Sequence, residues 1–72
     1  MNEIILVFVD NQPVKIYRGM QVKHALIAFN QALYQAAVAG ELRIEDSYGF
    51  QVGLEGALQE GSRIFTKATR EG

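Results

Sequence analysis

Hydrophobic residues along this chain follow two different periods, and each period predicts a different kind of element. Residues 4–9 are six apolar side chains without a break, four of them β-branched, and the turn formers Asp10 and Asn11 follow directly. An apolar run of this length, bounded by turn residues, predicts a central strand. In residues 14–18 apolar positions then alternate with other residues until a glycine. We therefore expect a β-hairpin whose second strand has one strongly apolar face.

The segment 22–39 changes to steps of three and four residues, which predicts a single amphipathic helix that ends before Gly40. Gln21 stands where Ser, Thr or Asp is the usual cap, so we expect the first helical turn to fray. The apolar stripe of this helix consists of Val22, Ala25, Leu26, Phe29, Leu33, Ala36 and Ala37.

Alternation returns after the helix and predicts three more strands, at 42–45, 50–52 and 63–67. A glycine-rich loop precedes the last of them, and its Leu54 and Leu58 are expected to fill the edge of the core. The element order is then ββαβββ. This order is typical of an α+β fold in which one helix packs across one face of a mixed sheet.

Two stretches carry a resemblance to a known fold family. They are "VFVDNQPVKIYRGMQVKHAL" and "IEDSYGFQVGLEGALQEGSRIFT", and together they cover nearly the whole chain. They resemble the β-grasp (ubiquitin-like) superfold of ubiquitin, the sulfur carriers of thiamine and molybdopterin synthesis, TGS domains and plant-type ferredoxins. Ser62 and Gln21 replace the Asp and Thr common in the family. The resemblance implies that the first and last strands are parallel neighbours at the sheet centre, and one superfold hosts many activities.

Length, composition and charge limit the class of protein and the partners that we expect. The chain has 72 residues, 49% of them hydrophobic, which is one small folded domain; we expect it to span 1–68, with a flexible tail at 69–72. The net charge of −1 gives no general reason to bind nucleic acid or an anionic membrane. Residues 4–9 are too short for a membrane span or a signal peptide, and no basic leader precedes them, so we expect a cytoplasmic protein.

Side chains that carry chemistry are scarce. No cysteine is present, which excludes disulfides, thiolate zinc sites and the cluster of a ferredoxin. His24 is the only histidine and is expected on the surface, with no nucleophile or carboxylate pair at a recognisable spacing. Glu41, Glu45 and Asp46 are interpreted as ordinary surface charges. We therefore expect no catalytic residue, no cofactor and no metal, and a protein that is not an enzyme.

The carboxyl-terminal residues bear on one alternative function, that of a sulfur carrier. Sulfur carriers of the resembled family end in Gly-Gly, since a side chain at the penultimate position would collide with the narrow channel of the activating enzyme. Here Glu71 precedes Gly72. The alternative function is therefore a sulfur-carrier-like protein of thiamine or molybdopterin type that is degenerate or needs processing of its tail.

The sheet face away from the helix is the leading candidate for function. The family pattern turns apolar residues of the first and last strands to this face, with cations around them, and an exposed apolar patch of this kind is typical of a binding site. The predicted partner-binding residues are Leu6, Phe8, Tyr17, Phe65, Lys15, Arg43, Arg63 and Lys67. We expect them to bind another protein, as a homodimer or on a larger partner.

Two alternatives to this surface stay open. Residues 4–9 are also compatible with a strong core strand whose outer side chains lie under the long stems of Lys and Arg. The helix offers a competing surface, since Ile27, Tyr34 and Val38 lie off its main stripe.

Overall fold

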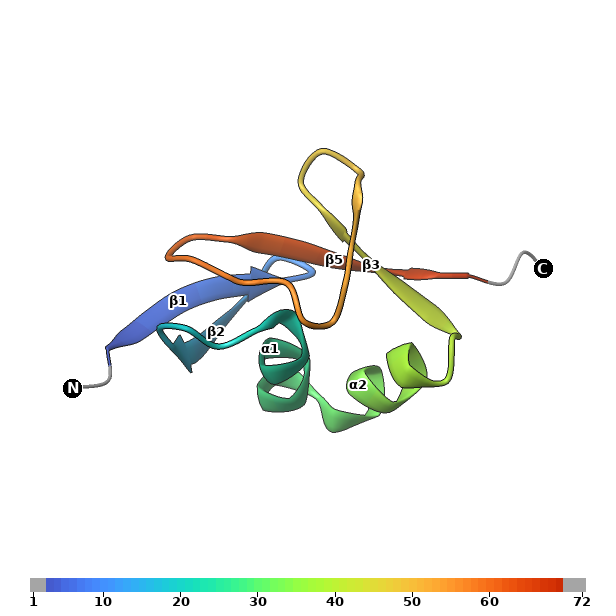
Figure 1. Ribbon diagram of the computed structural model, residues 1–72, viewed down its shortest axis with the longest axis horizontal. Helices are drawn as coiled ribbons and strands as arrows, with labels where there is room; N and C mark the ends of the chain where they lie inside the picture. The colour runs from blue at the N-terminus through green and yellow to red at the C-terminus, as the bar shows by residue number, and fades with distance from the viewer. Residues whose placement is uncertain (1–2, 70–72) are drawn as a thin grey trace.

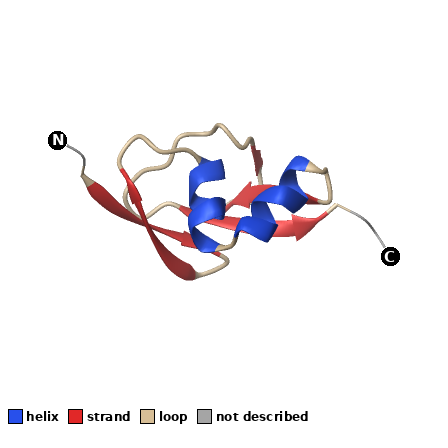
Figure 2. Cartoon of the chain, turned by 90° about the horizontal axis from the view of Figure 1, so that it is seen from below, coloured by secondary structure: helices blue, strands red, loops and turns tan. Residues whose placement is uncertain are grey.

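The computed structural model describes residues 3–69, and it consists of a five-stranded mixed sheet with two helices on one face (Figures 1 and 2). In chain order the elements are β1 (Ile4–Val9), β2 (Gln12–Tyr17), α1 (Val22–Phe29), α2 (Gln31–Val38), β3 (Leu42–Asp46), β4 (Gln51–Val52) and β5 (Arg63–Ala68). The strand order across the sheet is β2-β1-β5-β3-β4. An α+β fold with a mixed sheet is thus confirmed, whereas the prediction of a single helix is wrong.

β1 and β2 form the predicted hairpin through the two-residue turn at Asp10 and Asn11. Both residues have positive φ, 50° and 69°. This conformation is required at the two central positions of a type I′ turn, and Asn and Asp tolerate it better than most residues. The turn sets the antiparallel register, in which Val7 lies opposite Val14 on the helix-facing side.

β5 lies at the centre of the sheet, parallel to β1 and antiparallel to β3. The backbone N–H of Phe8 donates to the carbonyl of Ser62 at 2.8 Å, and that of Asp10 to the carbonyl of Ile64 at 2.9 Å. The first and last strands are therefore parallel neighbours, as the resemblance implied.

Asn30 divides the predicted helix in two. Its backbone is extended, with φ −165° and ψ 110°, and its N–H still donates to the carbonyl of Leu26 at 2.8 Å, which closes α1. Its side-chain oxygen accepts the N–H of Ala32 at 3.0 Å, which begins α2. One residue thus serves as the C-cap of α1 and the N-cap of α2, and Asn is among the residues best suited to the second role.

The core lies between the sheet and the helices. Its buried side chains are Ile5, Val7, Val9, Val14, Ile16, Val22, Ala25, Leu26, Ile44, Leu58 and Ile64. Leu54 packs against this cluster together with Tyr34, which was predicted off the helical stripe. Phe29, predicted within the stripe, is instead 38% exposed. The break at Asn30 accounts for Tyr34, because it changes which face α2 turns to the sheet, and Phe29 is the last residue of α1, directly before the break.

The end of the described chain is joined to the body of the protein. Thr69 donates from its N–H to the carbonyl of Glu41 at 3.1 Å and from its hydroxyl to the carbonyl of Gly40 at 2.7 Å. Residues 70–72 lie outside the described residues. They include Glu71 and Gly72, on which the sulfur-carrier alternative depends. Within residues 3–69, neither helix has the length and apolarity needed to cross a membrane.

Candidate protein-interaction surface

The outer face is the side of the sheet that both helices leave uncovered (Figure 2). At its centre the guanidinium carbon of Arg63 lies 4.2 Å from the centroid of the Phe8 ring. Phe8 and Arg63 are register partners on neighbouring parallel strands, so the sheet itself positions this stack. The guanidinium covers part of the ring, and Phe8 is half-buried as a result.

Phe65 follows on the same side of β5, two residues or about 7 Å beyond Arg63. It is also half-buried, and its register partner across β3 is Glu45. The Nε of Arg43 lies 2.9 Å from a carboxylate oxygen of Glu45, so this acid neutralises one of the predicted cations. The cationic rim beside Phe65 is therefore reduced to Lys67, which lies opposite Arg43.

Leu6 lies at the other end of the outer face. Its carbonyl accepts the N–H of Gly61 at 2.7 Å, and its own N–H points to the carboxylate of Glu60 at 3.3 Å. Gly61 lies two residues before β5 begins, and Phe65 is the third residue of β5. The register thus brings Phe8, Arg63 and Phe65 together and leaves Leu6 at a distance from Phe65.

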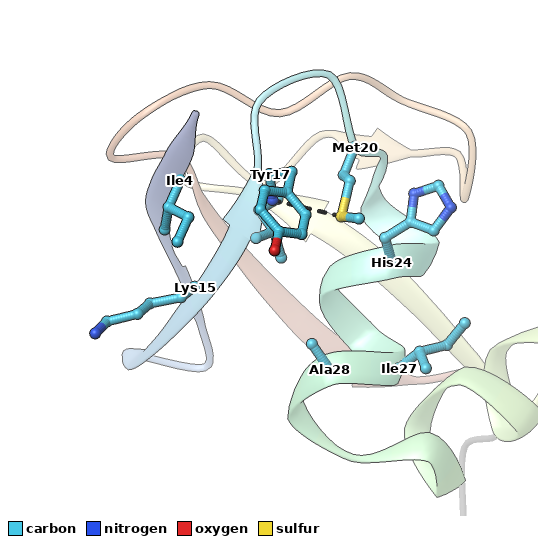
Figure 3. A pocket seen from close by; sticks show the side chains of 8 residues that line it. Ile4, Lys15, Tyr17, Met20, His24, Ile27 and Ala28 are labelled. Atoms are coloured by element: carbon cyan, nitrogen blue, oxygen red, sulfur yellow. Dashed lines mark hydrogen bonds between the residues drawn. The ribbon is translucent and has the colours of Figure 1, made fainter. Parts of the chain in front are cut away.

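Tyr17 and Lys15 belong to the edge strand β2, where they line a hollow of about 390 Å³ between the strand and α1 (Figure 3). We call this hollow the edge hollow. Its apolar lining comes from Ile4, Ile16, Tyr17, Met20, Ile27 and Ala28. Lys15 and His24 complete the lining, and the Lys15 amine points away from α1.

The most exposed aromatic side chains are elsewhere, at the turn between β3 and β4. Tyr48 is 84% exposed and Phe50 is 70% exposed. One carboxylate oxygen of Asp46 accepts the backbone N–H of Tyr48 at 2.9 Å and that of Phe50 at 3.0 Å, while Gly49 takes φ +85°. We call Tyr48, Gly49 and Phe50 the hairpin tip. Sequence reasoning missed this site, although two aromatic residues around a turn glycine in "DSYGF" were a usable signal.

His24 differs from its predicted place on the surface. It is half-buried in the first turn of α1, and its Nδ1 accepts the backbone N–H of Gln21 at 2.9 Å. This contact is one half of a capping box, in which the side chain at the third helical position reaches back to the N-cap amide. The start of α1 is thus capped although Gln21 is not a usual cap residue.

Acidic side chains are engaged in local contacts. Glu45 pairs with Arg43, and Asp46 fixes the hairpin turn. In the part of the chain that the structure describes, no three His, Asp or Glu side chains lie close enough to hold a metal ion. Comparison of the sequence with models of protein families gives no match, and neither does comparison with curated proteins. The proposed function therefore rests on the geometry of the surface.

Proposed function

We propose that this chain is a non-enzymatic β-grasp module that binds another protein, a second copy or a larger partner, through the outer face. The parallel pair β1–β5 at the sheet centre and the helical segment between β2 and β3 support the β-grasp assignment. The two short helices depart from the single helix of that pattern. Because a fold alone does not define an activity, the function rests on the surface.

The stack of Arg63 on Phe8, with Phe65 next along β5, is the observation that carries the proposal. Interface hot spots are enriched in arginine and aromatic side chains that become fully desolvated on binding. A guanidinium already held over a ring loses less side-chain freedom on association than a free one, which lowers the entropic cost of binding. Lys15 and Lys67 at the margins supply the polar rim typical of such surfaces.

The test compares Phe65→Glu with Val38→Glu, which places the same charge on an exposed apolar site of α2. For self-association, amide shifts of the ¹⁵N-labelled protein are followed on dilution. We expect them to move at Phe8, Arg63 and Phe65 in the natural protein and in Val38→Glu, and to stay fixed in Phe65→Glu.

For a larger partner, proteins retrieved with each bait are compared, and the partner lost with Phe65→Glu is purified and its binding measured directly. Binding at least tenfold weaker for Phe65→Glu than for Val38→Glu supports the proposal. Two results together exclude the outer face as the binding surface. The amide shifts of its residues do not change on dilution, and the two baits retrieve the same proteins.

A further inference from the structure

The edge hollow adjoins β2 and the hairpin tip joins β3 to β4, so the two sites lie at opposite edges of the sheet. β2 and β4 are the outermost strands, and four strand spacings of about 4.8 Å separate them by about 19 Å. Within residues 3–69, no Cα atom of β3 or β4 lies within 8 Å of a Cα atom of β2 or α1. The hairpin tip therefore does not reach the edge hollow of its own molecule.

The backbone of β2 shows what kind of group the edge hollow accepts. Antiparallel pairing with β1 turns the N–H and C=O groups of Pro13, Lys15 and Tyr17 outward. Pro13 has no N–H, and the N–H of Tyr17 lies 3.5 Å from the sulfur of Met20, whose own N–H donates to the Tyr17 carbonyl. Only Lys15 keeps both groups for a new strand. The edge hollow is thus suited to side chains and poorly suited to strand addition.

The chemistry of the edge hollow selects apolar side chains that have an anion beside them. Its walls are apolar, and no acidic residue of the described chain lines it. Among residues 3–69, Lys15 at its margin forms no ion pair. An apolar concavity with a few polar groups at its edge is the usual form of a binding site.

The hairpin tip has these properties. Tyr48 and Phe50 are largely exposed, and Asp46 holds the backbone at both residues, so little backbone freedom remains to be lost on binding. The Asp46 carboxylate pairs with no cation in the described chain. Two exposed aromatic side chains beside a carboxylate complement an apolar hollow that has an ammonium group at its margin.

We propose that the hairpin tip of one molecule binds the edge hollow of a second copy, so that molecules join head to tail. Since the two surfaces lie at opposite edges, the contact is heterologous and builds an open chain or a ring. Two aromatic side chains bury about 300 to 500 Å². A standard interface buries about 800 Å² per partner, so the association is weak and depends on protein concentration. Lys15 lies at the margin of both surfaces, whereas Phe8, Arg63 and Phe65 at the centre of the outer face take no part in this contact.

Mixing two variants tests this contact. Phe50→Ser removes part of the hairpin tip and keeps the edge hollow, whereas Ile27→Glu places an acid in the edge hollow and keeps the hairpin tip. Ile27 is 43% exposed, so the fold should tolerate the change. We label Phe50→Ser with ¹⁵N and add unlabelled Ile27→Glu. The expected result is amide shifts at Lys15, Met20 and Ala28. With the labels exchanged, shifts are expected at residues 46–50.

In the matched control, unlabelled Phe50→Ser is added to labelled Phe50→Ser. No molecule in this mixture has an intact hairpin tip, so the shifts should be at most half of those seen with Ile27→Glu. If Ile27→Glu loses its dispersed amide spectrum, Ala28→Glu replaces it in the same scheme. Equal shifts in the experiment and the control overturn the proposal, and so does the absence of shifts at about 1 mM protein. Shifts confined to Phe8, Arg63 and Phe65 overturn it as well and favour the outer face.

Discussion

The carboxylate of Asp10 accepts two hydrogen bonds from Thr66, one from its backbone N–H at 2.9 Å and one from its hydroxyl at 2.7 Å. Asp10 belongs to the turn between β1 and β2, and Thr66 belongs to β5. The pair thus fastens the first hairpin to the central strand, beyond the point where β1 ends. Hydrogen bonds to a charged group are stronger than those between neutral groups.

Replacement of Asp10 by glycine should lower the free energy of unfolding by about 2 kcal/mol, since two charge-assisted hydrogen bonds are lost. Glycine is chosen because it accepts the positive φ of this position without strain. Asp10→Asn keeps one acceptor oxygen and should lose about half as much. Urea unfolding measures both values. Equal stability of Asp10→Gly and the natural protein would show that the contact contributes nothing.

The stack of Arg63 on Phe8 should appear as a coupling energy. In a double-mutant cycle with Phe8→Leu and Arg63→Met, we expect the two residues to be coupled by about 0.5 to 1 kcal/mol, as for a partly exposed cation–π pair. Methionine keeps the length of the stem and removes the charge. Additive losses in urea unfolding, with no coupling beyond error, would refute a stabilising role for this contact.

His24 should be replaceable by glutamine but not by alanine. His24→Ala removes the acceptor for the Gln21 N–H and should lower the free energy of unfolding by about 1 kcal/mol. His24→Gln offers a side-chain oxygen at the same position of the capping box and should keep most of the stability. Thermal unfolding followed by circular dichroism distinguishes the two. A loss in His24→Gln as large as in His24→Ala would assign the effect to packing.

The sequence pattern predicted the strands well because strand alternation and turn residues are local signals. The run at residues 4–9 became β1, and Asp10 and Asn11 became its turn. The break at Asn30 was missed because apolar residues keep their three- and four-residue spacing across it. The helix is interrupted because the Asn30 side chain accepts a hydrogen bond from the N–H of Ala32. The spacing of apolar residues carries no information about such a bond.

The candidate site was predicted only in part, since it depends on register and on side-chain contacts between distant segments. The family pattern places Phe8 and Phe65 on the outer face, and their neighbours Val7 and Ile64 are buried on the opposite face. That Arg63 covers Phe8 and that Leu6 lies far from Phe65 follow from the pairing of β1 with β5, which no local pattern specifies. The hairpin tip was missed for a different reason, since the contacts that shape it are local and run from Asp46 to the backbone N–H groups of Tyr48 and Phe50.

The central place of β5 has a consequence for the order in which the fold can form during synthesis. A ribosome releases the β1–β2 hairpin first, then the helices and the β3–β4 hairpin, and β5 only afterwards. Until β5 emerges, the two hairpins have no strand between them, and the inner edges of β1 and β3 stay unpaired. Because an isolated two-stranded hairpin is at best marginally stable in water, the sheet becomes stable only when β5 pairs with both β1 and β3.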